Sequence, residues 1–309
     1  MIACVFSGQG SQAAGMGREL NEKSIAARLV YAEAADLLSL DLLRLDDSQL
    51  AETRFAQLAI VTFSLAAWQA YRVVASPETA HAYAGFSLGE YSALGAAGVL
   101  GMNELLELVQ ERARLMQEAA EATPGAMFAI VGLDEAAVRA VVSQANYSSQ
   151  VFAVNFNCPG QIVIAGRAKP AEACAEELKA AGARRLVRLN VNGAFHTPLM
   201  ADAARQLEAY ARRLDFRPPS GPFYSNRTGA RVEAKPDWPA CLAAHMVSAV
   251  RWSDEVIALD RNGCAAWLEF GPGKVLTGLI RRILPGSTVF PVEDSRSLSE
   301  ALTDICANW

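Results

Sequence analysis

The sequence contains few of the features that mark membrane-spanning, exported or nucleic-acid-binding proteins. Its longest apolar stretches, such as residues 58–70, include Gln69 and are too short to span a bilayer. No basic segment followed by an apolar run begins at Met1, so we expect no signal peptide. The net charge of −5 provides no overall attraction to nucleic acid or to an anionic membrane. We therefore expect neither nucleic acid nor a membrane as a partner.

Cysteine and histidine are also sparse, which argues against disulfide frameworks and metal sites. The 309 residues include three histidines and six cysteines, with no Cys-x-x-Cys pair and no His-Glu-x-x-His motif. Scattered cysteines in a chain of this length indicate reduced, mostly buried thiols of a cytoplasmic protein. A catalytic role for Cys158, beside Pro159-Gly160, is a disfavoured alternative. The six are Cys4, Cys158, Cys174, Cys241, Cys264 and Cys306.

Two glycine-rich segments only partly match nucleotide-binding motifs. Gly8-x-Gly10-x-x-Ala13 resembles a relaxed dinucleotide fingerprint, but Glu33, the acidic residue at the right spacing, falls within a helical pattern. Gly271-Pro272-Gly273-Lys274 lacks the phosphate-loop spacing, because Leu268 and Val275 occupy positions that require glycine and Ser or Thr. We therefore expect neither a nucleotide cofactor nor a metal.

The composition that is present, 52% hydrophobic and 20% charged residues, is typical of a globular α/β protein. Apolar periodicity predicts strands at residues 2–6, 81–84, 126–133, 151–156, 161–165, 185–191, 223–225, 266–270 and 288–292. It predicts helices at residues 19–43, 57–74, 103–124, 134–145, 170–181, 198–213, 238–246, 252–260 and 274–283, and a further alanine-rich helix after residue 89. The order β-α-β-β-α-β within residues 125–191 indicates a ferredoxin-like insertion. Residues 1–124 and 192–309 would then form one larger α/β domain.

The most informative stretch is Gly85-x-Ser87-x-Gly89, directly after the predicted strand 81–84 and before the alanine-rich helix. A serine between two glycines at a strand-to-helix turn indicates a nucleophile elbow. The turn is tight enough to require glycine on both sides, and it projects the hydroxyl outward. Ser87 is therefore the candidate nucleophile.

A serine nucleophile needs a base and donors for the oxyanion. Of the histidines, His81 precedes the elbow and His245 lies in a predicted helix, whereas His196 lies in a glycine-bearing loop at a strand end. Because catalytic groups collect in such loops, His196 is the favoured general base. The amide of Leu88 and one from the Gly8-Gln9-Gly10 turn are candidate oxyanion donors.

Two arginines, Arg112 and Arg114, lie on the helix that follows the elbow. We expect one of them to be an ordinary solvated charge. A buried arginine at the base of the site would suit a carboxylate-bearing substrate, which guanidinium binds through two hydrogen bonds.

Five motifs, in order from the first strand to the last helix, resemble those of the malonyl-CoA:acyl carrier protein transacylase family. They are Gly8-Gln9-Gly10-Ser11-Gln12, Gly85-Phe86-Ser87-Leu88-Gly89-Glu90-Tyr91-Ser92, Arg112-Ala113-Arg114-Leu115-Met116-Gln117, Asn155-Phe156-Asn157-Cys158-Pro159-Gly160-Gln161 and Gly271-Pro272-Gly273-Lys274-Val275-Leu276. The resemblance implies an α/β-hydrolase-like large domain with a parallel sheet and an inserted ferredoxin-like small domain. It also implies ping-pong transfer of malonyl from malonyl-CoA to the phosphopantetheine thiol of an acyl carrier protein, by an enzyme without a cofactor of its own.

The resemblance also implies roles for individual residues. Ser87 would be acylated, His196 would be its base, and the amides of Gln9 and Leu88 would form the oxyanion hole. Arg112 would bind the malonyl carboxylate. The expected substrate-binding set is completed by Phe86, Met116, Phe195 and His245, the last near a backbone carbonyl that supports the catalytic histidine.

Three departures from the family pattern stand out. Phe86 replaces the His or Gln usual between glycine and serine, which makes the pocket more apolar, and Ser7 replaces a common proline. His245 stands where free-standing members often have glutamine and polyketide synthase versions often have histidine. Gly193-Ala194-Phe195-His196 resembles the malonyl-selective signature of those versions, in which Phe195 would fill the space of an α-methyl branch.

Several alternatives remain at this level. The enzyme could serve fatty acid or polyketide synthesis, with a slight preference for the latter from Phe195 and His245. An editing acyl hydrolase and a non-catalytic carrier-protein docking module are the competing functions. An acidic carrier protein would require a local basic surface, and we expect a monomer. The candidates for that surface are Arg184, Arg185, Arg188, Lys274, Arg281 and Arg282.

Overall fold

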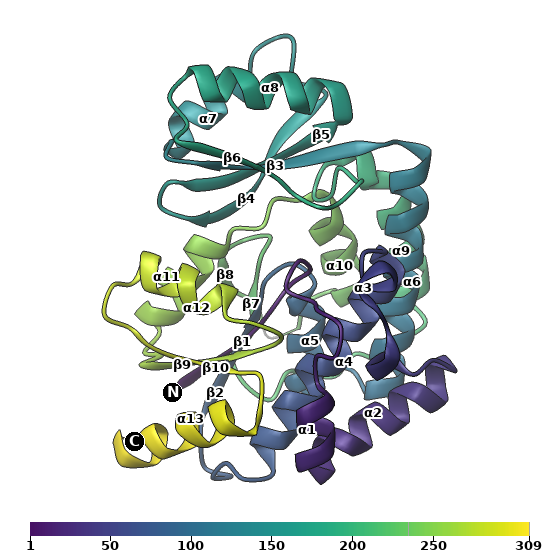
Figure 1. Cartoon of the computed structure of the whole chain (residues 1–309), viewed down its shortest axis with the longest axis vertical. Helices are drawn as coiled ribbons and strands as arrows, with labels where there is room; N and C mark the ends of the chain where they lie inside the picture. Colours follow the sequence, from purple (N-terminus) through teal and green to yellow (C-terminus); the bar gives the residue numbers. More distant parts are fainter. Residues whose placement is uncertain (234, 309) are drawn as a thin grey trace.

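The computed structural model describes residues 1–233 and 235–308, and side chains up to residue 305; Cys306 lies outside the described side chains. Two α/β units lie one above the other, the smaller one at the top of Figure 1 and both chain ends in the larger one below. The larger unit begins with β1 (Ile2–Phe6), α1 (Arg18–Lys23), α2 (Ile25–Leu38), the 3₁₀ helix η1 (Leu42–Arg44), α3 (Asp47–Leu50), α4 (Thr53–Arg72), β2 (His81–Gly85), α5 (Gly89–Ala96) and α6 (Met102–Ala122).

The small unit follows, and the chain then returns to the larger one. The small unit contains β3 (Gly125–Val131), α7 (Glu135–Val142), β4 (Val151–Cys158), β5 (Gln161–Arg167), α8 (Ala168–Ala180) and β6 (Arg185–Arg188). The remaining elements are η2 (Pro198–Met200), α9 (Ala201–Ala211), β7 (Tyr224–Ser225), β8 (Ala230–Arg231), α10 (Trp238–Val247), α11 (Trp252–Arg261), β9 (Ala266–Phe270), α12 (Val275–Ile283), β10 (Thr288–Val292) and α13 (Ser295–Asn308).

The large unit is built on a parallel sheet with strand order β10-β9-β1-β2. All five residues of central β1 are buried, as expected for a strand covered on both faces. Alternate side chains enter two separate cores. Ile2, Cys4 and Phe6 pack with residues of α4, whereas Ala3 and Val5 pack with residues of α11 and α12. This sandwich places the carboxyl ends of β1 and β2 side by side.

The small unit is an antiparallel sheet with strand order β4-β5-β3-β6, the arrangement of the predicted βαββαβ insertion. Helices α7 and α8 cover the face turned away from the large unit (Figure 1). Phe128 and Ile130 of β3 pack in a core with these helices, while Met127 and Ala129 join the main core. The α/β fold class with a small inserted domain is therefore confirmed. The boundaries at residues 124/125 and 191/192 stay predictions.

Several predicted elements differ in extent. The helix expected over residues 19–43 is interrupted at Ser24, whose side chain instead accepts the Ala27 amide and caps α2. The helix expected at residues 198–213 begins with a 3₁₀ turn after Thr197, whose hydroxyl accepts the Leu199 amide. Helix α13 was not predicted. None of the helices in residues 1–233 and 235–308 combines the length and apolar character needed to cross a bilayer.

Candidate active site

The turn between β2 and α5 has the geometry of a nucleophile elbow. Ser87 adopts φ +52°, a left-handed conformation that costs a non-glycine residue energy. A Cβ on Gly85 would lie 2.0 Å from the carbonyl carbon of Gly89, and one on Gly89 would lie 1.9 Å from the Phe6 carbonyl oxygen. Both flanking glycines are therefore required by close backbone contacts, and Ser87 is held where strand becomes helix.

His196 lies within hydrogen-bond distance of this serine, although 109 positions separate them. The Ser87 Oγ is 2.7 Å from His196 Nε2. The other ring nitrogen, Nδ1, lies 3.1 Å from the carbonyl oxygens of both His245 and Ser248. Since carbonyl oxygens only accept, Nδ1 carries the proton and Nε2 is free to accept one from the serine.

The surroundings of His196 keep its imidazole neutral. Burial is the main cause, and the positive charge of Arg112 the second, of a pKa lowered to about 4. The two carbonyl contacts oppose this shift in pKa because they favour the protonated ring. At neutral pH the ring is therefore in the form that a general base requires.

Two amides near Ser87 can serve as oxyanion donors. Gln9 and Leu88 both line the cavity that contains the serine. Within the described part of the chain, neither amide N–H has an intramolecular acceptor. The amide of Ser87 itself is occupied, since it donates to Asn226 Oδ1 at 2.6 Å. The arrangement leaves two N–H donors for a developing negative charge, that of Gln9 in the loop between β1 and α1 and that of Leu88 in the elbow.

Arg112 is a buried cation without an anionic partner. Its side chain on α6 is 1% exposed, and Nη1 donates to Gln57 Oε1 at 2.6 Å. The guanidinium lies 4.8 Å from the centre of the Tyr91 ring, and Nε has no hydrogen-bond partner among the described residues. None of the ion pairs found there includes Arg112, and burial lowers its pKa. A cation in this state is suited to a carboxylate that arrives with the substrate.

The cavity that joins these groups is small, about 90 Å³. Besides the groups above, its walls include the predicted residues Phe86, Met116 and Phe195. His245 is not among the lining residues. It is fully buried, and its ring centre lies 5.2 Å from that of His196, so its predicted part in substrate binding stays a prediction. The cavity is lined by Gln9, Phe86, Ser87, Leu88, Arg112, Met116, Met127, Asn155, Leu189, Val191, Phe195 and His196.

The sequence predicted no site role for three polar residues at or behind this cavity, although Asn155 is part of one of the five motifs. Gln57 binds Arg112, Asn155 brings a buried amide from the small domain, and Asn226 contacts the Ser87 amide. Gln57 does not stand out in the sequence, because its helix α4 also contains Thr62, Ser64 and Gln69. Asn226 follows a short strand and precedes a turn, where asparagine is common for local reasons, so its pattern carries no distinct signal.

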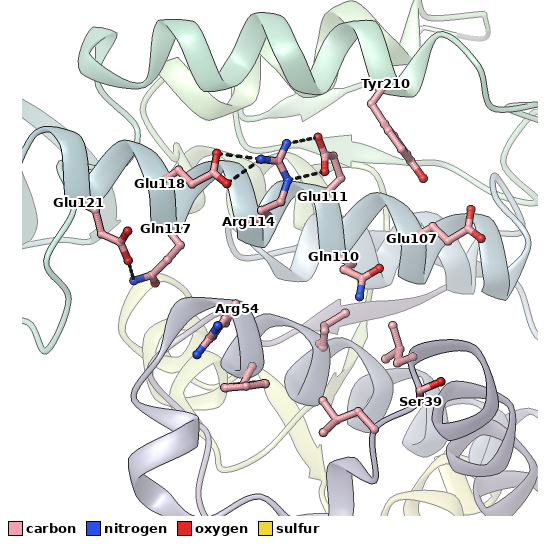
Figure 2. A pocket seen from close by; sticks show the side chains of 14 residues that line it. Ser39, Arg54, Glu107, Gln110, Glu111, Arg114, Gln117, Glu118, Glu121 and Tyr210 are labelled. Atoms are coloured by element: carbon pink, nitrogen blue, oxygen red, sulfur yellow. Dashed lines mark hydrogen bonds and ion pairs between the residues drawn. The ribbon is translucent and has the colours of Figure 1, made fainter.

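A larger hollow of about 910 Å³ is bordered by α6 residues that do not line the serine cavity, among them Glu111, Arg114 and Glu118 (Figure 2). It is lined by residues from α2, α4, α6 and α9, and by none of the cavity residues above. Arg114 lies in its wall and binds Glu111 and Glu118. This hollow is therefore separate from the serine site.

The parallel core, the serine elbow, its histidine and the two free amides together define the class of an acyltransferase with an α/β-hydrolase-like domain. The acyl transferase domain family matches residues 3–289. The chain is 37% identical to a malonyl CoA-acyl carrier protein transacylase of Bacillus subtilis over 306 residues, 97% of this chain and 96% of that protein. The chain thus belongs to the acyl transferase domain family, within its malonyl CoA-acyl carrier protein transacylases.

Solved structures agree with this membership. A malonyl-CoA:acyl carrier protein transacylase of Xanthomonas oryzae superposes with a TM-score of 0.92 at 36% identity, covering 98% of each chain. A malonyl-transacylase solved in complex with a type II PKS acyl-carrier protein gives a TM-score of 0.90 at 35% identity, covering 98% of this chain and 99% of that one.

Proposed function

We propose that the protein transfers malonyl from malonyl-CoA to the phosphopantetheine thiol of an acyl carrier protein through a malonyl-serine intermediate. The observation that carries the residue assignment is one small cavity in which Ser87, hydrogen-bonded to a neutral His196, faces an arginine without a counter-ion. The family membership supports the transferase reaction, and this cavity supports the choice of acyl group.

In the first half-reaction the Ser87 Oγ attacks the thioester carbonyl while His196 Nε2 takes the hydroxyl proton. The carbonyl oxygen becomes negative and accepts hydrogen bonds from the amides of Gln9 and Leu88. The carbon–sulfur bond then breaks, and the imidazolium returns its proton to the departing CoA sulfur. In the second half, His196 takes the proton of the carrier thiol, whose sulfur attacks the carbonyl of malonyl-Ser87. The bond from that carbonyl carbon to Ser87 Oγ then breaks, and the imidazolium returns its proton to Oγ.

Recognition of malonyl is assigned to Arg112. Its guanidinium forms charge-assisted hydrogen bonds with the free carboxylate, which supplies the anion that the buried charge lacks. Phe195, Phe86 and Met116 shape the apolar walls around the methylene carbon. We propose that the Phe195 ring fills the space that an α-methyl branch on the acyl group would need.

An editing hydrolase for uncharged acyl groups is disfavoured by the same arginine. Such an enzyme would gain nothing from a buried cation that its substrate leaves unpaired. A docking module without catalysis is disfavoured by the 2.7 Å contact between Ser87 and His196, which docking would not require.

The carrier-protein surface is assigned to basic residues on both units. Arg184, Arg185 and Arg188 belong to the small unit near β6, and Lys274, Arg281 and Arg282 to the large unit near α12. Arg282 Nη1 donates to Gln161 of β5 at 3.0 Å, which joins the large unit to the small one. Reversing Arg185 and Lys274 to glutamate should weaken the apparent affinity for carrier protein at low salt; unchanged affinity would place docking elsewhere.

The remaining assignments concern the cofactor requirement, the oligomeric state, the compartment and the pathway. The proposed chemistry needs no cofactor, because side chains and amides move every proton and hold every charge. We assign it to a monomer and to the cytoplasm. Only the compartment is supported by the free thiols of Cys4, Cys158, Cys174, Cys241 and Cys264, which suit a reducing environment. The slight preference for polyketide over fatty acid synthesis rests on Phe195 and His245.

Mass spectrometry of the protein after treatment with malonyl-CoA tests the proposal. We expect an adduct of malonyl mass on Ser87, none in Ser87→Ala, and its loss when carrier protein is added. No adduct on the wild-type serine would contradict the proposed mechanism. Rapid hydrolysis of acetyl-CoA without malonyl transfer would instead favour the editing hydrolase.

A further inference from the structure

Asn226 contacts the nucleophile elbow at three positions, although it is distant in sequence and belongs to none of the motifs above. It follows β7 directly and is fully buried. Its side chain Oδ1 lies 2.6 Å from the Ser87 amide nitrogen, and its Nδ2 lies 2.6 Å from the Gly85 carbonyl oxygen. Its own backbone amide donates to Glu90 Oε2 at 2.8 Å. One residue therefore binds the elbow before, at and after the serine.

The backbone decides which way this amide side chain points. The Ser87 N–H can only donate and the Gly85 carbonyl can only accept, so oxygen and nitrogen of Asn226 cannot be exchanged. The second Nδ2 hydrogen meets Glu255 Oε2 at 2.6 Å. The second Oδ1 contact is His245 Nε2 at 3.3 Å. All four hydrogen-bonding capacities of the side chain are thus used.

The same contacts connect the serine with its base. His245 must donate from Nε2 to the Asn226 oxygen, which fixes its neutral tautomer. The backbone carbonyl of His245 accepts from His196 Nδ1 at 3.1 Å. Asn226 therefore contacts Ser87 directly and is linked to His196 through His245.

Two buried carboxyl groups hold Asn226 in turn. Glu255 is 0% exposed and lies on α11, while Glu90 is 3% exposed and lies on α5. Burial raises the pKa of both groups, that of Glu90 to about 7. Elements from both sides of the parallel sheet thus meet at this amide.

We propose that Asn226 is a positioning residue, which holds Ser87 in its left-handed conformation and, through His245, keeps the serine and His196 in register. Ser87 at φ +52° and His196 at φ +60° both adopt conformations that non-glycine residues rarely occupy. Such conformations persist where surrounding contacts over-determine them. Engaging the Ser87 N–H also keeps that donor away from the oxyanion, which leaves it to Gln9 and Leu88. This inference rests on the proposed roles of Ser87 and His196.

The test compares Asn226→Ala with Ser225→Ala, a matched control. Ser225 precedes Asn226 and its hydroxyl also binds Glu90, at 3.2 Å, but none of the hydrogen bonds of its described side chain reaches Gly85 or Ser87. Displacement of a reacting group by an ångström can cost about 100-fold in rate, so Asn226→Ala should slow malonylation of Ser87 by roughly that factor. The KM for malonyl-CoA should stay within about threefold, because Arg112 is untouched.

A second measurement separates positioning from substrate binding. The labelling rate of Ser87 by a fluorophosphonate, which carries no carboxylate, should fall by a similar factor in Asn226→Ala and hardly change in Ser225→Ala. If Asn226→Ala does not fold, Asn226→Asp decides. Aspartate keeps the acceptor for the Ser87 amide and the side-chain shape, but turns an oxygen towards the Gly85 carbonyl and Glu255.

The outcomes distinguish this inference from the proposed function. A folded Asn226→Ala or Asn226→Asp variant that malonylates Ser87 within about threefold of the wild-type rate would overturn the positioning role. A wild-type protein that forms no malonyl-Ser87 at all would overturn the proposed mechanism instead. Slow labelling with unchanged KM and an unaffected Ser225→Ala control would support both.

Discussion

The two faces of helix α6 carry the same residue type in opposite electrostatic situations. Arg112 and Arg114 are two positions apart, about 200° around a helix of 3.6 residues per turn. Arg112 on the inner face is 1% exposed and binds the neutral Gln57. Arg114 on the outer face is paired with Glu111 at 2.6 Å and with Glu118 at 2.7 Å (Figure 2). Carboxylates therefore lie within ion-pair distance of the cation that water could have solvated, whereas the buried cation has none that close among the described residues and interacts with Glu90 only at longer range.

Under the proposed function, the outer charge serves folding and the inner charge serves a ligand. Half-exposed ion pairs contribute about 0–1 kcal/mol to stability, whereas an unpaired buried charge costs several kcal/mol after relaxation. The hydrogen bond to Gln57 and the Tyr91 ring offset part of that cost. We infer that the inner arginine is maintained at the expense of stability because the missing anion arrives with the substrate.

Removing the inner charge should have the largest effect on malonyl transfer. Arg112→Ala should reduce malonyl transfer far more than acetyl transfer, by about 2–4 kcal/mol in relative transition-state stabilisation. This corresponds to a selectivity change of roughly 30- to 900-fold. The measurement is kcat/KM for malonyl-CoA and acetyl-CoA with one carrier protein, and Arg114→Ala is the matched control. Equal losses for both substrates would show that Arg112 does not recognise the carboxylate.

Giving the inner arginine a carboxylate of its own should make the two faces alike. In Gln57→Glu the new carboxylate would occupy the position 2.6 Å from Arg112 Nη1 and compete with malonyl. We expect kcat/KM for malonyl-CoA to fall by about tenfold or more, with little change for acetyl-CoA and a higher Tm, because a buried charge gains a partner. Unchanged malonyl selectivity together with a raised Tm would mean that the carboxylate binds elsewhere in the cavity.

The inner charge should also be visible in the pH dependence of Ser87 reactivity. The pKa of His196 is lowered to about 4, first by burial and then by Arg112. Because the neutral ring is the base, labelling of Ser87 by a fluorophosphonate should persist below pH 6 and decline only as pH falls towards 4. Arg112→Ala should move this decline to higher pH, since it removes a charge that disfavours imidazolium.

The outer arginine gives the control for that shift. Arg114 is not among the groups that shift the pKa of His196, so Arg114→Ala should leave the acid limb unmoved. A decline centred near pH 6.5 in the wild type would contradict the assignment of a buried, neutral base.

What the sequence could predict depended on whether a residue acts through local or distant contacts. The elbow was predictable because the Gly-x-Ser-x-Gly pattern is local: Gly85 is required by Gly89 in the same turn, although the neighbour that requires Gly89 is Phe6 of β1. His196 was favoured from its loop, but the 2.7 Å contact with Ser87 spans 109 positions and needed the fold. Asn226 was missed because its partners lie 139 and 141 positions away, at Ser87 and Gly85.

The pair on α6 illustrates the same limit. The sequence predicted that one of the two arginines would be solvated, and family resemblance pointed to Arg112 as the carboxylate ligand. The local pattern alone does not separate Arg112 from Arg114. Only the packing of α4 and α5 against α6 shows that Gln57 and Tyr91 face the first of them. The identity of the unpaired charge is therefore a property of tertiary structure.

The smallest effect is expected on the outer face. Arg114→Ala removes two ion pairs of a side chain that is 48% exposed, so it should lower the free energy of unfolding by only about 0.3–1 kcal/mol. That loss should shrink in 1 M salt, because exposed pairs are screened, and kcat/KM for malonyl-CoA should stay within about twofold of wild type. Denaturant unfolding at low and high salt measures the first, and the transfer assay the second. Because Arg114 is already paired with two carboxylates, we do not expect it to bind the malonyl carboxylate. A loss of malonyl transfer as large as that of Arg112→Ala would therefore contradict the assignment of different roles to the two faces of α6.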